Sequence, residues 1–259
     1  MRLSQEHYDR IAHCFPKHRG SLTYSNLEVL NAILYIAENG AKWRRLPKEH
    51  GHWHTVYARM RGWAKQGVLA RVFEAMQAQQ IIEFKIEVCS LDSTSVKVHP
   101  DGAGALKKNG PQAIGRSRGG LTTKVHLVAA NERTALCFSL SAGQAADAPE
   151  GRKLLEAWKP AIPQGMKAVV MDRAYEGDET RQLVLALELQ PVVPPKVNRL
   201  NPWEYDRETY KRRNEVERLF RRLKGFRRIF SRFEKLDVMF TTFIHFALIV
   251  DGLIYINTP

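Results

Sequence analysis

The chain has 259 residues, 44% of them apolar, and a formal net charge of +13 at pH 7. This length accommodates one large domain or two modest ones, and the apolar fraction is sufficient for a buried core. So much positive charge is unusual for a protein that binds only small neutral ligands. It favours a polyanionic partner, nucleic acid ahead of an anionic membrane surface.

The cysteine content and the apolar segments indicate a protein of the cytoplasm. Three cysteines without a CxxC pair argue against a disulfide framework and against a cysteine zinc site. No positive leader with an apolar stretch is evident at the N-terminus, so we expect no secretory signal. Residues 240–256 are apolar but interrupted by His245, Asp251 and Gly252, short of the roughly 20 residues that span a bilayer. We expect a buried helix there and no membrane partner.

Residues 1–84 are expected to form a small helical domain. Apolar residues recur at helical spacing in residues 25–40, and Gly40 ends that pattern. Similar patterns follow in residues 54–67 and 68–79. Short helices with exposed Lys and Arg are compatible with a helix-turn-helix reader of DNA, although most small helical domains do not read DNA.

Residues 85–259 are expected to form a second domain of mixed α/β class. From residue 86 the pattern alternates and β-branched residues become frequent, which predicts strands. The expected strands are 86–98, two more within 120–143 around a turn at Asn131 and Glu132, then 167–172 and 191–195. The expected helices are 148–160, 178–189, a long basic helix over 210–230 and the apolar helix near the end. This order indicates a mixed sheet with helices packed on it.

Two aspartates lie where a sheet would bring them to a functional edge. Asp92 lies inside an apolar strand, where a carboxylate costs free energy unless it is paired, hydrogen-bonded or metal-bound. An alternative is bonding to the Ser93 and Thr94 hydroxyls. Asp172 directly follows an apolar run and is expected at the carboxyl edge of a buried strand, where α/β sheets bind ligands. Asp178 is better placed than Asp172 to cap the next helix.

The basic helix carries two glutamates whose roles differ. Between residues 210 and 235 there are eleven Lys or Arg against three Glu, which suggests a binding face. Glu215 and Glu217 point about 160° apart on a helix and cannot share a site. Four residues share an arc of roughly 80° with Glu217: Tyr210, Arg213, Arg221 and Lys224. No comparable set of residues shares an arc with Glu215. The alternative for Glu217 is an ion pair with Arg213 or Arg221.

Carboxylates from two strands and one helix would supply the few hard oxygen ligands that a pair of Mg²⁺ ions needs. Such a pair stabilises the attacking and leaving oxygens of a phosphoryl displacement. Nearby arginines would bind the DNA backbone. The sequence contains no G-x-x-x-x-G-K-[ST] loop for cradling phosphates, so we expect no nucleotide cofactor.

The chain resembles bacterial insertion-sequence transposases of the DDE type, close to the insertion-sequence-five group of the insertion-sequence-four-like transposases. The most specific match is the signature Y-x2-R-x3-E-x6-K, met here by Tyr210, Arg213, Glu217 and Lys224. LDSTSVKVHPDG and VVMDRAYEGDE, residues 91–102 and 169–179, resemble the two aspartate segments of the family. Residues 31–63 resemble the helical module that precedes many of these catalytic domains.

The resemblance implies an RNase H-like fold with Asp92, Asp172 and Glu217 as catalytic residues and metal ligands. Glu215 is then expected to face solvent. The 44 residues between Asp172 and Glu217 leave room for one helix, one strand and a loop, so the large inserted β-domain of some relatives is not expected.

The implied reaction is Mg²⁺-dependent cleavage at the ends of the element, with Mn²⁺ able to substitute, followed by direct attack of the 3′ hydroxyls on target DNA. The implied partners are double-stranded DNA, both terminal inverted repeats and target, and further copies of the chain on that DNA. The location is the bacterial cytoplasm, on the nucleoid. The expected DNA contacts are Tyr210, Arg213, Arg221, Lys224, Arg227 and Arg228, with Lys107, Lys108, Arg116 and Arg118 from a Gly-rich loop.

Two other functions remain open at this point. One is a DNA-binding regulator or transposition inhibitor that no longer catalyses, and the other is a metal-dependent nuclease without strand transfer. The intact triad favours the transposase, because a pure binder has no need of three carboxylates that repel DNA. We expect Glu215→Gln to change little.

Overall fold

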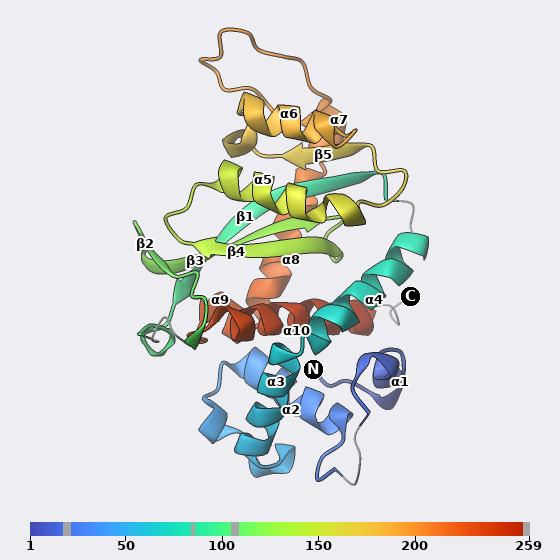
Figure 1. Ribbon diagram of the computed structural model, residues 1–259, viewed down its shortest axis with the longest axis vertical. Helices are drawn as coiled ribbons and strands as arrows, with labels where there is room; N and C mark the ends of the chain where they lie inside the picture. Colours follow the sequence, from blue (N-terminus) through green and yellow to red (C-terminus); the bar gives the residue numbers. More distant parts are fainter. Residues whose placement is uncertain (18–21, 84–85, 105–108, 256–259) are drawn as a thin grey trace. The chain divides into compact units, whose positions relative to one another are not determined.

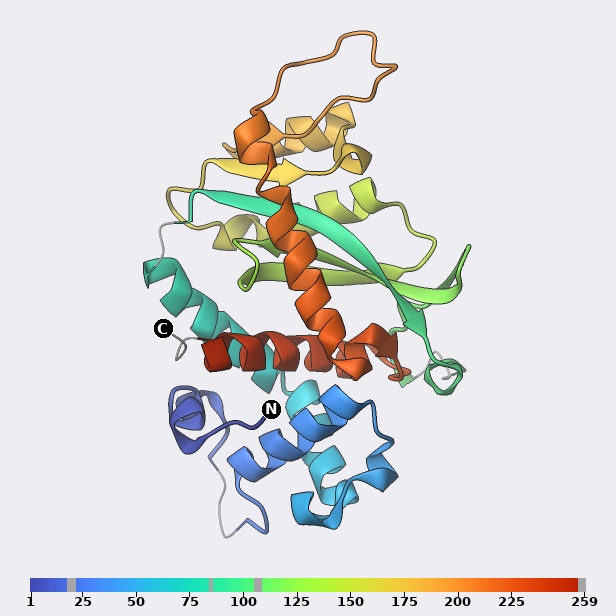
Figure 2. The same ribbon diagram turned by 180° about the vertical axis from the view of Figure 1, so that it is seen from behind.

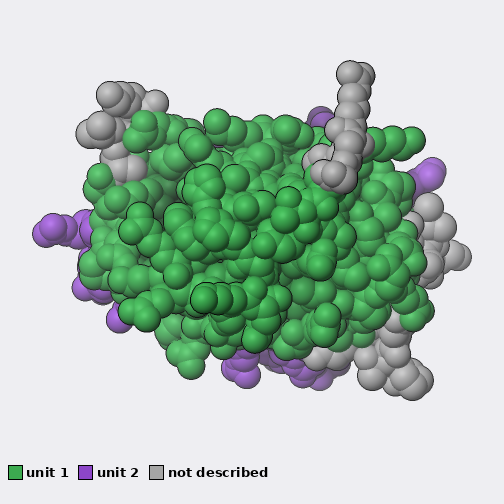
Figure 3. Space-filling model, turned by 90° about the horizontal axis from the view of Figure 1, so that it is seen from below, with its two compact units in different colours: residues 1–79, 98–112, 223–259 green, residues 80–97, 113–222 purple. Residues whose placement is uncertain are grey.

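A computed structural model describes residues 1–17, 22–83, 86–104 and 109–255. It divides into two compact units: unit 1, residues 1–79, 98–112 and 223–259, and unit 2, residues 80–97 and 113–222. The separate stretches of unit 1 present one continuous surface in Figure 3. The residues from 223 onward therefore group with the N-terminal helices, whereas the sequence analysis placed them with the sheet.

Unit 1 is helical. Its α-helices are α1 (Gln5–Asp9), α2 (Asn26–Asn39), α3 (Trp53–Lys65), α4 (Val68–Glu83, shared with unit 2), α9 (Arg227–Phe230) and α10 (Asp237–Tyr255). Its short elements are the 3-10 turns η1 (Ala12–Cys14), η2 (Trp43–Arg45), η3 (Lys48–His50) and η4 (Pro100–Gly102), and the two-residue strand β7 (Ser231–Arg232). The helices expected within residues 1–84 are confirmed.

Helix α2 shows how local sequence sets these boundaries. The Ser25 hydroxyl accepts a hydrogen bond from the Glu28 backbone N–H, and the Glu28 carboxylate accepts one from the Ser25 N–H. This reciprocal cap satisfies two N–H groups that have no partner within the helix. At the other end Gly40 adopts a left-handed conformation with φ of 65°, which glycine tolerates without strain, and the helix ends there as predicted.

Helix α10 forms much of the unit 1 core. Phe240, Phe243 and Phe246 are fully buried, and the Phe243 ring lies 6.1 Å from the ring of Trp43. The helix continues through His245, Asp251 and Gly252, and the buried helix predicted for this segment is confirmed. Residues Asp237–Ile254 are long and apolar enough to cross a bilayer, but 67% of this window is buried, as in a core helix.

Unit 2 contains a mixed sheet. Its strands are β1 (Val88–Val98, ending in unit 1), β2 (Gly115–Ser117), β3 (Gly120–Ala129), β4 (Ala135–Ala142), β5 (Ala168–Met171) and β6 (Gln190–Val192). Strands β1, β3 and β4 pair antiparallel, β2 adds to β3, and β5 and β6 continue from β1 in parallel. The predicted strands and the mixed sheet flanked by helices are confirmed.

Helices cover both faces of this sheet. Helices α5 (Asp147–Trp158) and α6 (Asp178–Ala186) pack on one face over a core that includes Leu91, Val128 and Met171. Helices α7 (Arg207–Tyr210) and α8 (Arg213–Gly225) follow β6. Figure 1 shows α5 on one side of the sheet, and Figure 2 shows α8 crossing the opposite side. Between β5 and α8 the described chain holds two 3-10 or helical turns, α6, β6 and a loop, with no inserted β-domain, as expected.

The prediction of a single basic helix over residues 210–230 is wrong, because the chain forms three helices there, α7, α8 and α9. The backbone of Phe226 is extended, with φ of −78° and ψ of 115°, and it follows Gly225, a weak helix former. Phe226 and Ile229, which follow Gly225, are both buried.

Candidate active site

Strand pairing brings the two predicted aspartates together. Strands β1 and β5 are parallel, with Leu91 paired to Met171. Asp92 and Asp172 are the next residues on these neighbouring strands, and they point to the sheet face opposite to the buried Leu91 and Met171, because side chains alternate. Helix α8 lies on that opposite face (Figure 2).

The Asp92 carboxyl is largely buried beside other acids. Burial, together with the negative charges of Asp172 and Glu217, raises its pKa to about 6, and the Ser93 N–H and Arg213 act in the opposite direction. The Ser93 backbone N–H donates to Asp92 Oδ1 at 2.7 Å, whereas the Ser93 hydroxyl donates to Asp147 on the other face. The Ser93 hydroxyl, one of the two partners considered for Asp92, is therefore engaged with Asp147, and Asp92 accepts instead from the Ser93 backbone.

Asp172 has a structural contact that the sequence analysis did not expect. It is the N-cap of the 3-10 turn η7 (Arg173–Tyr175), and its carboxylate accepts a hydrogen bond of 2.8 Å from the Ala174 N–H. Asp178 does not cap α6, because Gly177 is the N-cap and Asp178 is the first helical residue. The prediction that Asp178 caps α6 is wrong.

Glu217 pairs with Arg213 one turn earlier on α8, so the ion pair weighed as the alternative is present. The Arg213 guanidinium lies in the field of all three acids. Burial lowers its pKa, but Glu217, Asp92 and Asp172, with Tyr210, raise it by more. The structure thus brings together five predicted site residues: Asp92, Asp172, Tyr210, Arg213 and Glu217.

Glu215 is only partly exposed and is paired, so the prediction of a freely solvated side chain is not confirmed. Its side chain is 24% exposed, less than the 39% of Glu217, and both of its carboxylate oxygens accept hydrogen bonds from Arg212. This contact lies across a helix boundary, at a spacing of three residues. The spacing alone gives a weak signal for it, because such pairs are common on helix surfaces.

The carboxylates suit a hard divalent cation by their donor chemistry. Asp92 and Arg213 both lie in the electrostatic field of Asp172 and Glu217, and carboxylate oxygens are the ligands that Mg²⁺ prefers. Among the described residues no three His, Cys, Asp or Glu side chains are yet close enough to hold one ion together. Glu217 would have to leave Arg213 to complete such a set.

The predicted DNA contacts fall in different environments. Arg116 on β2, Arg118 in the following turn, Arg221 and Arg227 are exposed, and Lys224 is half-buried, which lowers its pKa. Lys107 and Lys108 lie outside the described residues.

Arg228 is placed differently from the prediction. It is 4% exposed, its guanidinium donates to Glu234 at 3.0 Å and to the Ala41 carbonyl, and it lies over the Phe233 ring. A side chain held in this way stabilises unit 1 and does not reach a DNA backbone. The error follows from the break at Phe226, which rotates the residues after it.

A polar cluster on the other face of the sheet was missed. The Ser93 hydroxyl and the Lys124 ammonium both contact Asp147 Oδ1, at 2.6 and 2.9 Å, and Lys124 also donates to the Ala145 carbonyl. These residues are far apart in the sequence and carry no recognisable spacing, so only the sheet register reveals them.

Comparison with known proteins gives two family matches. Residues 3–73 match a family model described as "Putative transposase of IS4/5 family", and residues 83–250 match the model "Transposase DDE domain". A "Putative transposase for insertion sequence element IS6501" from Brucella ovis is 33% identical over 129 residues, 49% of this chain and 95% of that protein. An uncharacterized protein of insertion element IS402 from Burkholderia cepacia is 33% identical over 85 residues, 31% of this chain and 58% of that protein.

Among solved structures, similarity is weak. The Mos1 mariner paired end complex with Mn is 14% identical, over 72% of this chain and 65% of that chain, with a TM-score of 0.27. A Mos1 transposase paired-end complex with the left transposon end is 13% identical, over 68% and 61%, also with a TM-score of 0.27. The chain spans less than two thirds of the length of these proteins.

Proposed function

The chain belongs to the insertion-sequence transposases with a DDE catalytic domain, and we propose that it cleaves the ends of its own element and joins them to target DNA. The observation that supports this most directly is the set of carboxylates Asp92 and Asp172 from the sheet and Glu217 from α8, whose charges all act on Arg213. A DNA-binding regulator has no need of this set. The family match disfavours that alternative as well.

We propose that the three carboxylates hold divalent cations, Mg²⁺ in the cell and Mn²⁺ as a substitute. Bound there, a pair of ions would stabilise the charge that develops on the attacking and leaving oxygens of the phosphodiester. Asp92 would stay ionised in that state, because a cation favours the charged form of a buried carboxyl whose pKa is otherwise raised.

The remaining residues would bind and orient DNA. Arg213 and Tyr210 lie in the field of Asp172, so a phosphate at the metals would lie within their reach. Exposed arginines of the β2–β3 hairpin and of α8 would hold the backbone further along by charge-assisted hydrogen bonds. Two copies of the chain on paired DNA ends, within the bacterial cytoplasm, complete this proposal.

The test is cleavage and joining of DNA that carries the gene's own flanking sequences, with Mg²⁺ or Mn²⁺. We expect wild type to give joined products, and Asp92→Asn, Asp172→Asn and Glu217→Gln each to lower the cleavage rate by about 10³-fold or more, since each removes a charge that acts in the transition state. DNA affinity, measured by fluorescence anisotropy without metal, should stay within a few-fold of wild type.

Other outcomes point elsewhere. Nicks without joining by wild type would favour a metal-dependent nuclease. Tight DNA binding without cleavage would favour a silent regulator. Full cleavage by Glu217→Gln would remove Glu217 from the site.

A further inference from the structure

Arg212 and Glu215 form a clasp at the start of α8, and we propose that this clasp positions Glu217 for metal binding. The inference rests on the proposed function, because it concerns the third carboxylate of that same site. Neither residue is part of the carboxylate set itself. Both act on it through the helix, so they are positioning residues.

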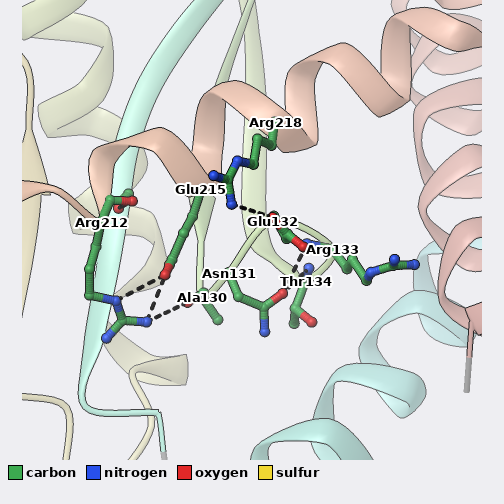
Figure 4. A network of polar contacts seen from close by, with 9 residues as sticks. Ala130, Asn131, Glu132, Arg133, Thr134, Arg212, Glu215 and Arg218 are labelled. Carbon is green, nitrogen blue, oxygen red and sulfur yellow. Dashed lines mark hydrogen bonds and ion pairs between the residues drawn. The ribbon is translucent and has the colours of Figure 1, made fainter. Parts of the chain in front are cut away.

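The contacts of the clasp join two separate parts of unit 2, the start of α8 and the chain that follows β3. Arg212 Nε and Nη2 donate to the two oxygens of Glu215 at 3.1 and 3.2 Å, and Nη2 also donates to the Ala130 carbonyl at 3.2 Å. Figure 4 shows Arg212 pointing between the helix and the chain that follows β3, with Glu215 directed toward it. The helix is thereby attached to the sheet by one guanidinium.

The anchor at Ala130 is itself rigid. The Ala130 N–H donates to the Thr134 carbonyl at 2.8 Å. Within the same turn, the Asn131 side chain accepts hydrogen bonds from the backbone N–H groups of Arg133 and Thr134, each at 2.9 Å (Figure 4). Ala130 is 3% exposed. A guanidinium that binds this carbonyl therefore binds a fixed point.

The backbone of Arg212 is attached to the strand that carries Asp92. The Ser90 hydroxyl donates to the Arg212 carbonyl at 3.3 Å, and Ser90 precedes Asp92 by two residues on the same face of β1. Arg212 is thus held by its carbonyl to β1 and by its side chain to the end of β3. Helix α8 starts at the next residue, and Glu217 lies in its second turn. The direction of the helix, and with it the position of the Glu217 carboxylate, follows from these attachments.

A charge-assisted, two-pronged contact holds a guanidinium in one orientation, which an amide or a lysine does not reproduce. Removing the Glu215 charge leaves Arg212 free to turn from Ala130 and toward the acids of the site. We expect the start of α8 to become mobile as a result. Metal ligands are sensitive to such support, since loss of a group that orients a ligand typically lowers metal affinity by about 10- to 100-fold.

The same turn offers a matched control. Arg218 donates to Glu132 at 2.7 Å and also joins α8 to the β3–β4 turn, but these side chains are 61% and 41% exposed. Exposed pairs contribute little to structure. Arg212 and Glu215, at 39% and 24%, are less accessible, and Arg212 alone has the backbone anchor. Glu132→Gln therefore breaks a neighbouring ion pair without loosening the clasp.

The experiment measures Mn²⁺ binding to the full chain without DNA, by electron paramagnetic resonance of the free ion, for wild type, Glu215→Gln, Arg212→Lys, Glu132→Gln and Glu217→Gln. We expect the Mn²⁺ dissociation constant of Glu215→Gln to rise by about 10-fold, and that of Arg212→Lys to rise also. Glu132→Gln should match wild type. Cleavage by Glu215→Gln should recover at high Mn²⁺, because the ligand is displaced and not removed.

Each contrary outcome has a distinct meaning. Wild-type Mn²⁺ affinity in folded Glu215→Gln and Arg212→Lys would overturn the clasp. An equal loss in Glu132→Gln would overturn it too, because any change at the turn would then suffice. If Glu217→Gln itself binds Mn²⁺ as wild type does, the proposed metal site fails, independently of Glu215. If Glu215→Gln no longer shows a cooperative thermal transition, it is not folded, and Glu215→Asp is measured in its place. Glu215→Asp keeps the charge and should weaken Mn²⁺ binding by less than the roughly 10-fold expected for Glu215→Gln.

Discussion

His245 stays uncharged inside unit 1, and this makes the stability of the protein sensitive to acid. Burial lowers the pKa of its imidazole to about 4, against about 6.5 for an exposed histidine, and its ring lies 5.3 Å from that of Phe73. Between these two pH values the unfolded chain binds a proton that the folded chain does not. The contribution of the neutral His245 side chain to the free energy of unfolding is therefore fully present above pH 6.5. It is lost as the pH falls toward 4.

We expect His245→Leu to remove this part of the acid sensitivity. Between pH 7 and pH 4 the free energy of unfolding of wild type should fall by about 2 to 3 kcal/mol more than that of the variant, from a pKa difference of about 2.5 units. Urea unfolding at several pH values measures the difference, and His13→Leu at an exposed histidine is the control. Parallel pH profiles for wild type and His245→Leu would contradict the assignment.

At the scale of single residues, burial within a strand was predictable and hydrogen-bond partners were not. The apolar runs before Asp92 and Asp172 located both at the sheet, because strand periodicity is a local property. Asp172 accepts a hydrogen bond from the turn that follows it, and Arg212, the partner of Glu215, donates to a carbonyl 82 residues earlier. Nothing in the spacing of either residue encodes these contacts.

Among the elements, the break at Phe226 has the largest effect on what the basic residues do. Helix-forming residues continue on both sides of Gly225, so the amphipathic pattern alone favours one helix. The break turns Arg227 outward and Arg228 inward. Two neighbouring arginines of the same apparent type thereby take different roles, one available to DNA and one inside unit 1.

We expect the variants of these two arginines to have opposite effects. Arg228→Ala leaves Glu234 as an unpaired buried charge and should lower the free energy of unfolding by about 3 to 5 kcal/mol. Arg227→Ala should change stability by less than about 0.5 kcal/mol, yet weaken DNA binding and reduce its salt dependence by about one unit of slope. Thermal unfolding and anisotropy titrations measure both. The reverse assignment of effects would show that Arg228, not Arg227, faces DNA.

For the whole molecule, the net charge of +13 and its concentration between residues 210 and 235 predict strongly salt-dependent DNA binding. The association constant for DNA of any sequence should fall by about 10³-fold or more between 50 and 200 mM salt, as for proteins that contact six or more phosphates. Arg116→Gln with Arg118→Gln should make the slope shallower by about two units. A slope near zero for wild type would mean that the basic residues do not contact phosphates.

The composition of unit 1 has a consequence for synthesis of the protein. Its first segment ends at residue 79, but its core includes α10, which ends at Tyr255. The N-terminal helices can therefore pack against α10 only after residues up to about 255 have emerged from the ribosome. Unit 2, in contrast, is complete once residue 222 has emerged. Nascent or prematurely terminated chains would carry a finished sheet and unfinished helices. The N-terminal helices therefore gain the α10 part of their core only after unit 2 has been synthesised.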